Sequence, residues 1–201
     1  MRQHTVNELD NFIGGWYLED HTICDRLVDY HKTMEKVEGG TYKGIVSGNK
    51  DVQSLNTDIK DSTDCILDGN TLLYNDYVKS LQEVVNLYIE KYPKANAYEA
   101  FYIRQYVNIQ RYNPTQGYHA WHTERANGTS PVLASRHLVF MTYLNDVTDS
   151  GETEFWHQKL KVKPEKGLTL IWPTDWTFTH RGITSPTQTK YVVTGWFNFT
   201  H

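Results

Sequence analysis

The sequence predicts a mainly β, α+β fold: an antiparallel β-sandwich or jelly roll with N-terminal helices packed on one sheet. The first half contains two stretches with apolar residues at helical spacing, and the second half contains many short runs with strand character. No linker divides the 201 residues, so we expect a single domain. Residues 1–97 should form a helical and loop support region, and residues 98–201 the jelly-roll core.

The first helix is expected to begin at Thr22, because Thr22 and Asp25 have the spacing of a capping box, and to end at Gly39. A second helix is expected over residues 74–92, where an apolar stripe at helical spacing runs up to a proline. Residues 37–64 are polar and lack a clear period. They predict a long loop with short strands, which is either a substrate lid or a disordered insertion.

The β part begins near residue 98. Apolar side chains over residues 101–109 recur with the period of two that a half-buried strand requires. Residues 1–19 are expected to form an opening strand or loop. Turn-forming steps separate several further runs with strand character, which cover residues 117–122, 138–144, 151–156, 159–163, 168–172 and 189–199.

Composition narrows the class of protein. A net charge of -4 argues against nucleic acid as an electrostatic partner. No run approaches the length of a membrane-spanning helix, and the polar start lacks the apolar segment of a signal peptide. The two cysteines, Cys24 and Cys65, are too few for a disulfide scaffold and lack metal or redox spacing. We therefore expect reduced thiols and a cytoplasmic location.

One short stretch carries the strongest chemical signal. His122 and Glu124 are two residues apart, so on a strand both side chains would project from the same face. With His180 from a neighbouring strand they would form a 2-His-1-carboxylate set, which leaves coordination positions open on Fe(II). By itself the pair also fits an ordinary surface histidine and glutamate. His119 is a nearby spare imidazole without a paired carboxylate.

A lysine downstream strengthens the metal interpretation. A turn after His180 should bring Lys190 beside the same site, and Lys190 shares a strand face with Val192, Thr194 and Trp196. A lysine on such a face points inward, where an ammonium is costly unless it is paired. The carboxylate of a bound ligand is a natural partner. The alternative is a lysine that extends to solvent at the mouth of the barrel.

The order of these motifs resembles that of the 2-oxoglutarate- and Fe(II)-dependent dioxygenases, specifically their prolyl 4-hydroxylase-like branch. That family shows Tyr-x-x-Gly-Gln-x-Tyr, His-x-Asp, Gly-Gly-Glu-Thr and an apolar strand ending in proline, followed by a histidine, a lysine and a tryptophan. The resemblance covers about residues 98–199. Its matching residues are Tyr112, Gln116, Tyr118, His122, Glu124, Gly151 to Thr153, Gly167 to Pro173, His180, Lys190 and Trp196.

The resemblance implies a double-stranded β-helix (jelly-roll) core and two cofactors, Fe(II) and 2-oxoglutarate, with O2 as a co-substrate and ascorbate as a further candidate. The metal ligands, which are also the catalytic residues, would be His122, Glu124 and His180. The residues implied for 2-oxoglutarate are Lys190, for its distal carboxylate, with Tyr112, Thr153 and Tyr118 as hydrogen-bond candidates.

Two departures from the family pattern stand out. The acidic ligand is Glu124 instead of aspartate, and the extra methylene would shift the metal or alter the placement of O2. Tyr118 to His122 is also one residue longer than the common pattern, which leaves open which tyrosine meets 2-oxoglutarate. Trp121 and Trp196 are candidates for the walls of a substrate pocket, and Arg136 and Arg181 for substrate contacts through their planar donors. Core packing or solvent exposure is the alternative for each.

The resemblance thus predicts an enzyme that hydroxylates an amino-acid side chain, by default proline in a peptide or protein. The alternatives are a dioxygenase acting on a small molecule, a non-catalytic metal-binding jelly-roll module, and a metal-dependent hydrolase or isomerase on a similar barrel. The sequence specifies neither the substrate nor the oligomeric state.

Overall fold

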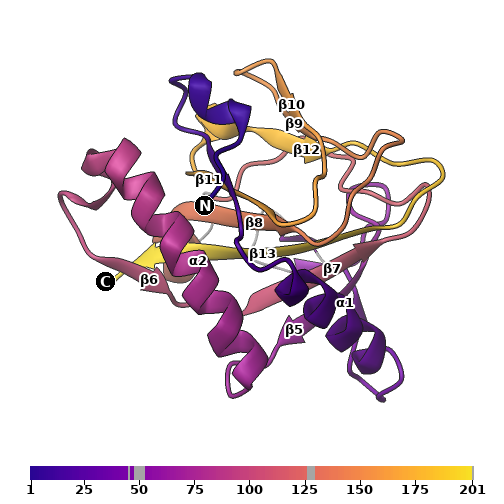
Figure 1. Cartoon of the computed structure of the whole chain (residues 1–201). Helices are drawn as coiled ribbons and strands as arrows, with labels where there is room; N and C mark the ends of the chain where they lie inside the picture. The colour runs from indigo at the N-terminus through magenta and orange to yellow at the C-terminus, as the bar shows by residue number, and fades with distance from the viewer. Residues whose placement is uncertain (45, 48–52, 126–129, 201) are drawn as a thin grey trace.

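A large antiparallel sheet forms the centre of the molecule (Figure 1). The computed structural model describes residues 1–44, 46–47, 53–125 and 130–200. The large sheet has eight strands. Seven follow the order β1-β11-β8-β13-β7-β5-β2, and the eighth, β6, pairs with the C-terminal end of β13, past the part that pairs with β7. Their bounds are β1 Gly14–Tyr17, β2 Tyr42–Lys43, β5 Thr63–Leu67, β6 Phe101–Ile103, β7 Val107–Tyr112, β8 Arg136–Tyr143, β11 Leu168–Pro173 and β13 Lys190–Phe199.

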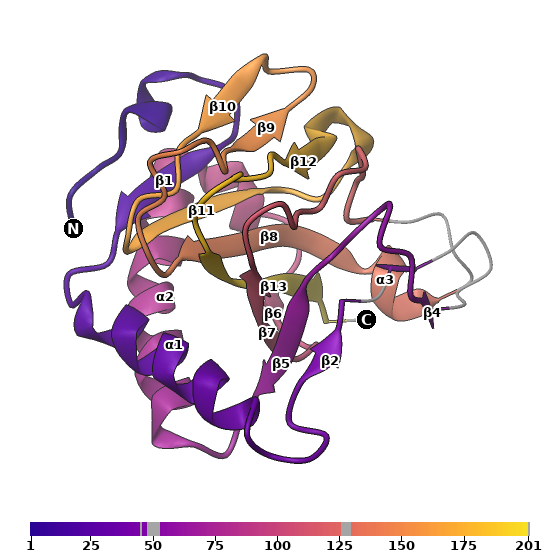
Figure 2. The same cartoon turned by 90° about the vertical axis from the view of Figure 1, so that its right-hand side faces the viewer.

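A smaller antiparallel sheet lies over one face of the large one (Figure 2). It has the order β10-β9-β12, with β9 at Thr153–Phe155, β10 at Leu160–Val162 and β12 at His180–Gly182. A separate hairpin pairs β3 (Val46–Ser47) with β4 (Gln53–Ser54). Two facing antiparallel sheets with helices outside the larger one make up the predicted jelly-roll class, so this prediction is confirmed.

Two long helices, α1 (Thr22–Met34) and α2 (Leu72–Lys91), cover the other face of the large sheet (Figure 1). The buried side chains of α2 recur at helical spacing, as the apolar stripe predicts. The shorter helices are α3 Pro131–Ala134 and the 3-10 turns η1 Thr5–Glu8, η2 Pro93–Asn96 and η3 Trp176–Phe178. Within the described part of the chain, no helix is both long enough and apolar enough to cross a membrane.

The predicted capping box at Thr22 is wrong. The first free amide of α1, the N–H of Thr22, is satisfied by the preceding Asp20, whose Oδ1 accepts its hydrogen bond at 2.8 Å. Asp25 points away and pairs with Lys166. The α2 helix has a true side-chain cap, because the hydroxyl of Thr71 accepts the N–H of Tyr74. The first helix also ends at Met34, earlier than Gly39.

The large sheet separates two hydrophobic layers because strand side chains alternate between its faces. On β8, Leu138 and Phe140 belong to the layer beneath the helices, whereas Val139 and Met141 belong to the layer beneath the small sheet. Both cysteines, Cys24 and Cys65, are fully buried in the helix-side layer as free thiols. The second layer leads into the site, since its members Val139, Met141 and Val192 also line the cavity described below.

The polar segment 37–64 contains the expected short strands. Strand β5, which begins at the end of this segment, was not predicted from the sequence. Strand β5 pairs with β7 inside the large sheet, so the sheet takes strands from both sides of residue 97. The run expected over residues 101–109 is divided into β6 and β7. The choice between lid and disordered insertion falls partly on residues 45 and 48–52, which lie outside the described residues.

Candidate metal and 2-oxoglutarate site

A cavity of about 410 Å³ lies between the inner face of the large sheet and the small sheet. The side chains of Lys190, Val192, Thr194 and Trp196, at alternate positions of β13, all line it. The predicted common face of this strand is therefore confirmed. Lys190 in particular points inward and is buried, so the alternative of a solvent-reaching lysine is wrong.

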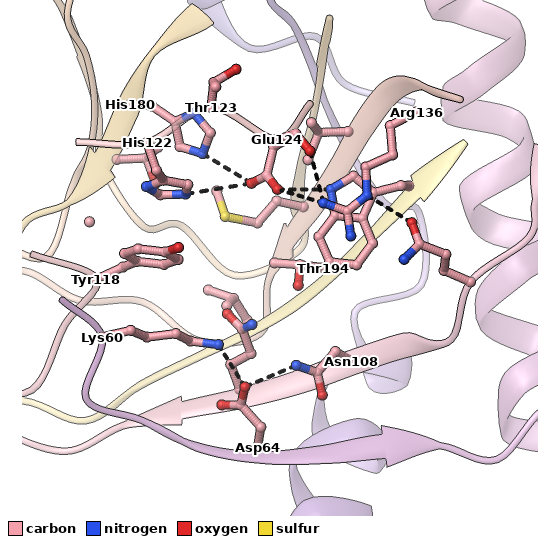
Figure 3. A pocket seen from close by; sticks show the side chains of 18 of the residues that line it. Lys60, Asp64, Asn108, Tyr118, His122, Thr123, Glu124, Arg136, His180 and Thr194 are labelled. Atoms are coloured by element: carbon pink, nitrogen blue, oxygen red, sulfur yellow. Dashed lines mark hydrogen bonds and ion pairs between the residues drawn. The ribbon is translucent and has the colours of Figure 1, made fainter. Parts of the chain in front are cut away.

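The three predicted metal ligands meet in this cavity (Figure 3). The Nε2 atoms of His122 and His180 lie 3.5 Å and 3.4 Å from the same oxygen, Oε1 of Glu124. All three ligand atoms lie within 4.8 Å of one another. The two histidines are held by a single β-bridge, in which each backbone N–H donates to the other residue's carbonyl at 3.0 Å.

The strand predicted over residues 117–122 is wrong in detail. The segment forms only two isolated bridges, from Tyr118 to Lys60 and from His122 to His180, with a bend at Ala120 between them. Glu124 lies in a bend just beyond. Just after Glu124, the N–H of Arg125 bonds to the carbonyl of Thr174. Both ligand side chains still face one centre, as the spacing predicts.

Backbone carbonyls fix the tautomer of both imidazoles. Nδ1 of His122 lies 3.1 Å from the carbonyl oxygen of Ala120, and Nδ1 of His180 lies 2.9 Å from that of Phe178. Since a carbonyl only accepts, Nδ1 must be the protonated nitrogen in each ring. The lone pair of each Nε2 then faces Oε1 of Glu124. This is the arrangement in which metal-binding histidines are oriented by their other nitrogen.

The protonation states suit metal binding. Burial lowers the pKa of His122, and the neighbouring His180 lowers it further, so the His122 ring is neutral near pH 7. Burial alone would raise the pKa of Glu124, but hydrogen bonds and charge from the two imidazoles in their protonated forms outweigh it and hold that pKa well below its usual range. Both shifts favour the deprotonated forms of His122 and Glu124, which coordination requires.

The second carboxylate oxygen of Glu124 is held from behind. Nε1 of Trp196 donates to Oε2 of Glu124 at 3.0 Å. Nη1 of Arg136 donates to the backbone carbonyl of Glu124 at 2.9 Å and lies 3.5 Å from Oε2. The guanidinium stacks 3.5 Å from the indole of Trp196. These contacts turn Oε1 towards the imidazoles and anchor a side chain that is one methylene longer than aspartate.

This donor set fits a divalent cation. Two Nε2 lone pairs and an ionised oxygen converge, and a cation among them would offset the mutual repulsion of these three atoms. Two imidazoles and one carboxylate leave coordination positions open and are the set that non-haem Fe(II) takes in oxygenases. His119 does not belong to the cluster; its Nδ1 lies near the hydroxyl of Thr184.

Lys190 is a buried ammonium whose charge is not neutralised by a close carboxylate. Its Nζ donates to the carbonyl of Gly151 at 2.8 Å and lies 5.3 Å from the ring centre of Tyr112. Gly151 has a φ of +86°, in the left-handed region that favours glycine. Burial lowers the pKa of Lys190 to about 8, and the charge of Glu152 opposes this only in part. Among the described residues, none forms an ion pair with Lys190, so an anionic ligand would supply the missing charge.

The other residues expected to contact 2-oxoglutarate differ in their availability. Tyr112 and Thr153 are buried and line the same cavity as Lys190. Each already takes part in a hydrogen bond: the Tyr112 hydroxyl donates to Gln110, and Oγ1 of Thr153 accepts from Tyr143. Tyr118 lies flat against His122, with ring centres 3.7 Å apart and planes at 6°. Its ring therefore covers a metal ligand, and all three roles stay predictions.

The predicted substrate contacts need two corrections. Trp121 does not line the cavity; its ring lies edge-to-face on Trp156 and under the guanidinium of Arg181. Arg136 lines the cavity, but its Nη1 donates to Glu124 and its Nε to Gln105, so it supports a metal ligand. Arg181 lines the cavity and is paired with Glu154 at 2.8 Å.

A second polar cluster in the cavity has no counterpart in the sequence predictions. Nζ of Lys60 donates to Oδ2 of Asp64 at 2.7 Å, and Nδ2 of Asn108 donates to the same oxygen at 3.0 Å. Figure 3 shows this cluster across the pocket from the triad, with Tyr118 beside it. The signal that could have revealed it is the polar residues Asn108 and Gln110, which alternate with apolar positions on β7.

Comparison with known proteins gives one family. Residues 107–198 match the family model described as the 2OG-Fe(II) oxygenase superfamily. The matched stretch contains every residue of the triad and Lys190. No curated protein matches the sequence of this chain.

Solved structures of low sequence identity share the fold. A prolyl-4-hydroxylase from Pseudomonas putida is 15% identical, with a TM-score of 0.71 over 94% of each chain. A viral collagen prolyl hydroxylase from Paramecium bursaria Chlorella virus-1, in its 2OG complex, is 16% identical with a TM-score of 0.65, over 94% of this chain and 96% of that one. A Trichoplax adhaerens prolyl hydroxylase bound to a hypoxia inducible factor peptide fragment is 16% identical with a TM-score of 0.71, over 96% of this chain and 86% of that one.

Proposed function

Because this chain belongs to the 2OG-Fe(II) oxygenase superfamily, we propose that it hydroxylates an amino-acid side chain, by default a prolyl residue, in a peptide or protein. The observation that carries the proposal is one cavity that contains both a site for a cation and a site for an anion. One is the set of converging lone pairs of His122, Glu124 and His180, which suits Fe(II). The other is the ammonium of Lys190, which suits a carboxylate.

The protein's own residues have separable tasks in this reaction. His122, His180 and Oε1 of Glu124 would hold the metal, and Lys190 would bind the distal carboxylate of 2-oxoglutarate. When bound, Fe(II) and 2-oxoglutarate supply oxidative hydroxylation driven by decarboxylation of the keto acid to succinate. Trp196 fixes the orientation of Glu124, and Tyr118 shields one imidazole from water by stacking on it.

Support for a peptide substrate comes from the shared fold and from the shape of the site. Among the solved structures with this fold, the Trichoplax adhaerens prolyl hydroxylase is bound to a peptide fragment. In this chain the cavity extends from the triad to side chains of β7 and β5, which offer hydrogen-bonding groups. A prolyl ring is compatible with the apolar part of that lining, which includes Val139, Met141 and Val192.

The test is turnover by the reconstituted enzyme. With Fe(II), 2-oxoglutarate and O2, blocked prolyl peptides should stimulate succinate formation and gain the mass of one oxygen atom. His180→Ala should reduce both to background and abolish metal binding. His119→Ala is the matched control, because this imidazole lies outside the cluster, and it should retain metal binding and turnover.

Other outcomes would replace the proposal with a specific alternative. Metal binding without any spectral or kinetic response to 2-oxoglutarate would indicate a non-catalytic metal-binding module. Turnover of a substrate without the keto acid would indicate a hydrolase or isomerase. Succinate formation that responds only to small molecules would retain the dioxygenase and reject the peptide substrate.

A further inference from the structure

The cavity contains two buried lysines whose charges are balanced in different ways. Lys190 has no close carboxylate among the described residues, whereas Lys60 forms a 2.7 Å ion pair with Asp64. Both members of that pair are almost completely buried. A ligand anion is therefore attracted to Lys190, and the ion pair of Lys60 requires no additional charge.

The pair is built to present hydrogen-bond donors to the cavity. Asp64 accepts from Lys60, Asn108 and the hydroxyl of Ser62, so both of its oxygens are used. Lys60 has three N–H groups, and one hydrogen bond from its Nζ is found within the described residues. At least one donor of Lys60 thus stays available beside the cavity that it lines.

A neighbouring side chain adds donors of the same kind. Gln110 lines the cavity on the face of β7 that also carries Asn108 and Tyr112. Its Oε1 already accepts from the hydroxyl of Tyr112 at 2.8 Å, which leaves its amide N–H groups for a ligand. Oδ1 of Asn108 is likewise taken, by the hydroxyl of Tyr42. Lys60, Asp64, Asn108 and Gln110 thus form a wall of the cavity. The acceptor oxygens of this wall already receive hydrogen bonds, whereas N–H donors remain for a ligand.

The wall is one aromatic ring away from the metal ligands. Nζ of Lys60 lies 5.8 Å from the ring centre of Tyr118, and the opposite neighbour of that ring is His122, at 3.7 Å. Backbone contacts hold this arrangement, because Lys60 and Tyr118 form a β-bridge. A ligand group bound at Lys60 would therefore lie within one residue's reach of the triad (Figure 3).

We propose that Lys60, supported by Asp64 and joined by Gln110, binds a main-chain carbonyl oxygen of the peptide substrate and so positions the reacting residue. This inference rests on the proposed function and specifies the substrate chemistry of the same site. The amide before a proline has no N–H group, so it can be recognised only through its carbonyl. A wall of donors whose acceptors are already occupied matches that amide.

A carbonyl fits this subsite better than the carboxylate of a free amino acid. Adding a carboxylate beside Lys60 would place two anions, the ligand and Asp64, against one buried cation. Burying a net charge is far more costly than burying a hydrogen-bonded neutral amide. The subsite therefore discriminates against free amino acids and in favour of residues within a chain.

The experiment compares matched peptides and matched variants. The probes are acetyl-Ala-Pro-Ala-amide, its analogue with a thioamide before proline, and free proline, titrated by calorimetry into protein loaded with Mn(II) and 2-oxoglutarate so that nothing turns over. The variant is the double substitution Lys60→Met/Asp64→Asn, because a single change would leave an unpaired buried charge and could prevent folding. Arg26→Met/Asp76→Asn removes an exposed pair between the two helices and serves as the control.

We expect the wild type to bind the oxo peptide about tenfold or more tightly than the thioamide, which accepts hydrogen bonds poorly, and to bind free proline weakest. The Lys60→Met/Asp64→Asn variant should lose that preference, while its affinity for 2-oxoglutarate stays within about twofold of wild type. The control variant should match wild type for every ligand.

Three results would overturn the inference. In the first, the double variant loses affinity for 2-oxoglutarate, which would make Lys60 the partner of the keto acid. In the second, the oxo–thio preference persists in the double variant, which would make the ion pair merely structural. In the third, wild type binds free proline but no blocked peptide while still consuming 2-oxoglutarate. An enzyme that never consumes 2-oxoglutarate, in contrast, would reject the proposed function itself.

Discussion

The site contains two buried carboxylates, Glu124 and Asp64, that are satisfied in opposite ways. Both oxygens of Asp64 accept hydrogen bonds from donors of the protein. Glu124 has one oxygen that accepts from Trp196 and lies near Arg136, and another that faces two imidazole lone pairs. Asp64 is complete as it stands, whereas Glu124 lacks a cation on one side.

The hydrogen bonding of these two carboxylates distinguishes the wall that contains Asp64, which can bind a ligand, from the metal site that contains Glu124. A carboxylate such as Asp64, which accepts three hydrogen bonds over its two oxygens, can stabilise and orient, but it has little accepting capacity left for a metal. A carboxylate that is held on one oxygen and open on the other is prepared for single-oxygen coordination, and its neighbours determine which oxygen is open. The extra methylene of glutamate is accommodated because Trp196 and Arg136 hold the far oxygen.

The most severe test of the contrast neutralises each carboxylate in turn. Glu124→Gln should abolish high-affinity metal binding and turnover with little change in folding stability. Asp64→Asn should leave metal affinity intact but lower the free energy of unfolding by about 3–5 kcal/mol, because it strands the buried charge of Lys60. Metal titration and denaturant unfolding of both variants measure this. Loss of metal affinity in the Asp64 variant would refute the contrast.

The next largest effect is expected at the unpaired lysine. Lys190→Met should weaken 2-oxoglutarate binding by about 10- to 100-fold, the range for a hydrogen bond to a charged group, while metal affinity changes little. The ligand-free variant should also melt at a higher temperature, because an unpaired buried ammonium has been removed. Calorimetry and thermal unfolding give both values. Unchanged affinity for the keto acid would show that this lysine is not its partner.

An effect of similar size, on metal affinity, is expected from the residue that orients Glu124. Trp196→Phe keeps the ring packing but removes the hydrogen bond from Nε1 to Oε2 of Glu124. Metal affinity should fall by about 10- to 100-fold, as is usual for groups that orient a ligand. Trp172→Phe is the control, since this indole also lines the cavity but its Nε1 has no hydrogen-bond partner in the described structure. Equal losses in the two variants would mean that packing, not orientation, is responsible.

The smallest effect concerns pH. Since burial lowers the pKa of Lys190 to about 8, its affinity for a carboxylate should be full below that pH and fall by about tenfold per unit above it. Without ligand the sign is reversed: the folded pKa lies below the ordinary value of 10.5, so stability should rise as pH increases between the two. Calorimetry across this window should show the slope in wild type and none in Lys190→Met, and a flat wild-type profile would contradict it.

The metal ligands and Lys190 could be predicted because short sequence spacings and the order of the motifs along the chain identify them. His122 and Glu124 share a face by their spacing, and the inward side of β13 follows from alternation with apolar neighbours. The polar segment before β5 has no such period, so Lys60 and Asp64 gave no signal of burial. Their positions depend on β5 joining the sheet beside β7, which is a tertiary event.

Contacts between side chains were the other part that sequence reasoning missed. Nothing in the sequence indicates that Arg136 and Trp196 meet the same carboxylate, because that meeting depends on the approach of β8 and β13. The position of Trp121 next to a ligand suggested a pocket wall. Because the adjacent His122 points into the cavity, the side chain of Trp121 points away from it and packs on Trp156.

The place of β13 in the large sheet has a consequence for how the molecule fluctuates. The strand pairs along its length with β6, β7 and β8, so its amide hydrogens should exchange with solvent only when most of the protein opens. The small strand β12, which carries His180, has three residues and should open far more often. The lysine end of the cavity is thus rigid before any ligand arrives, and metal binding should slow exchange mainly around β12.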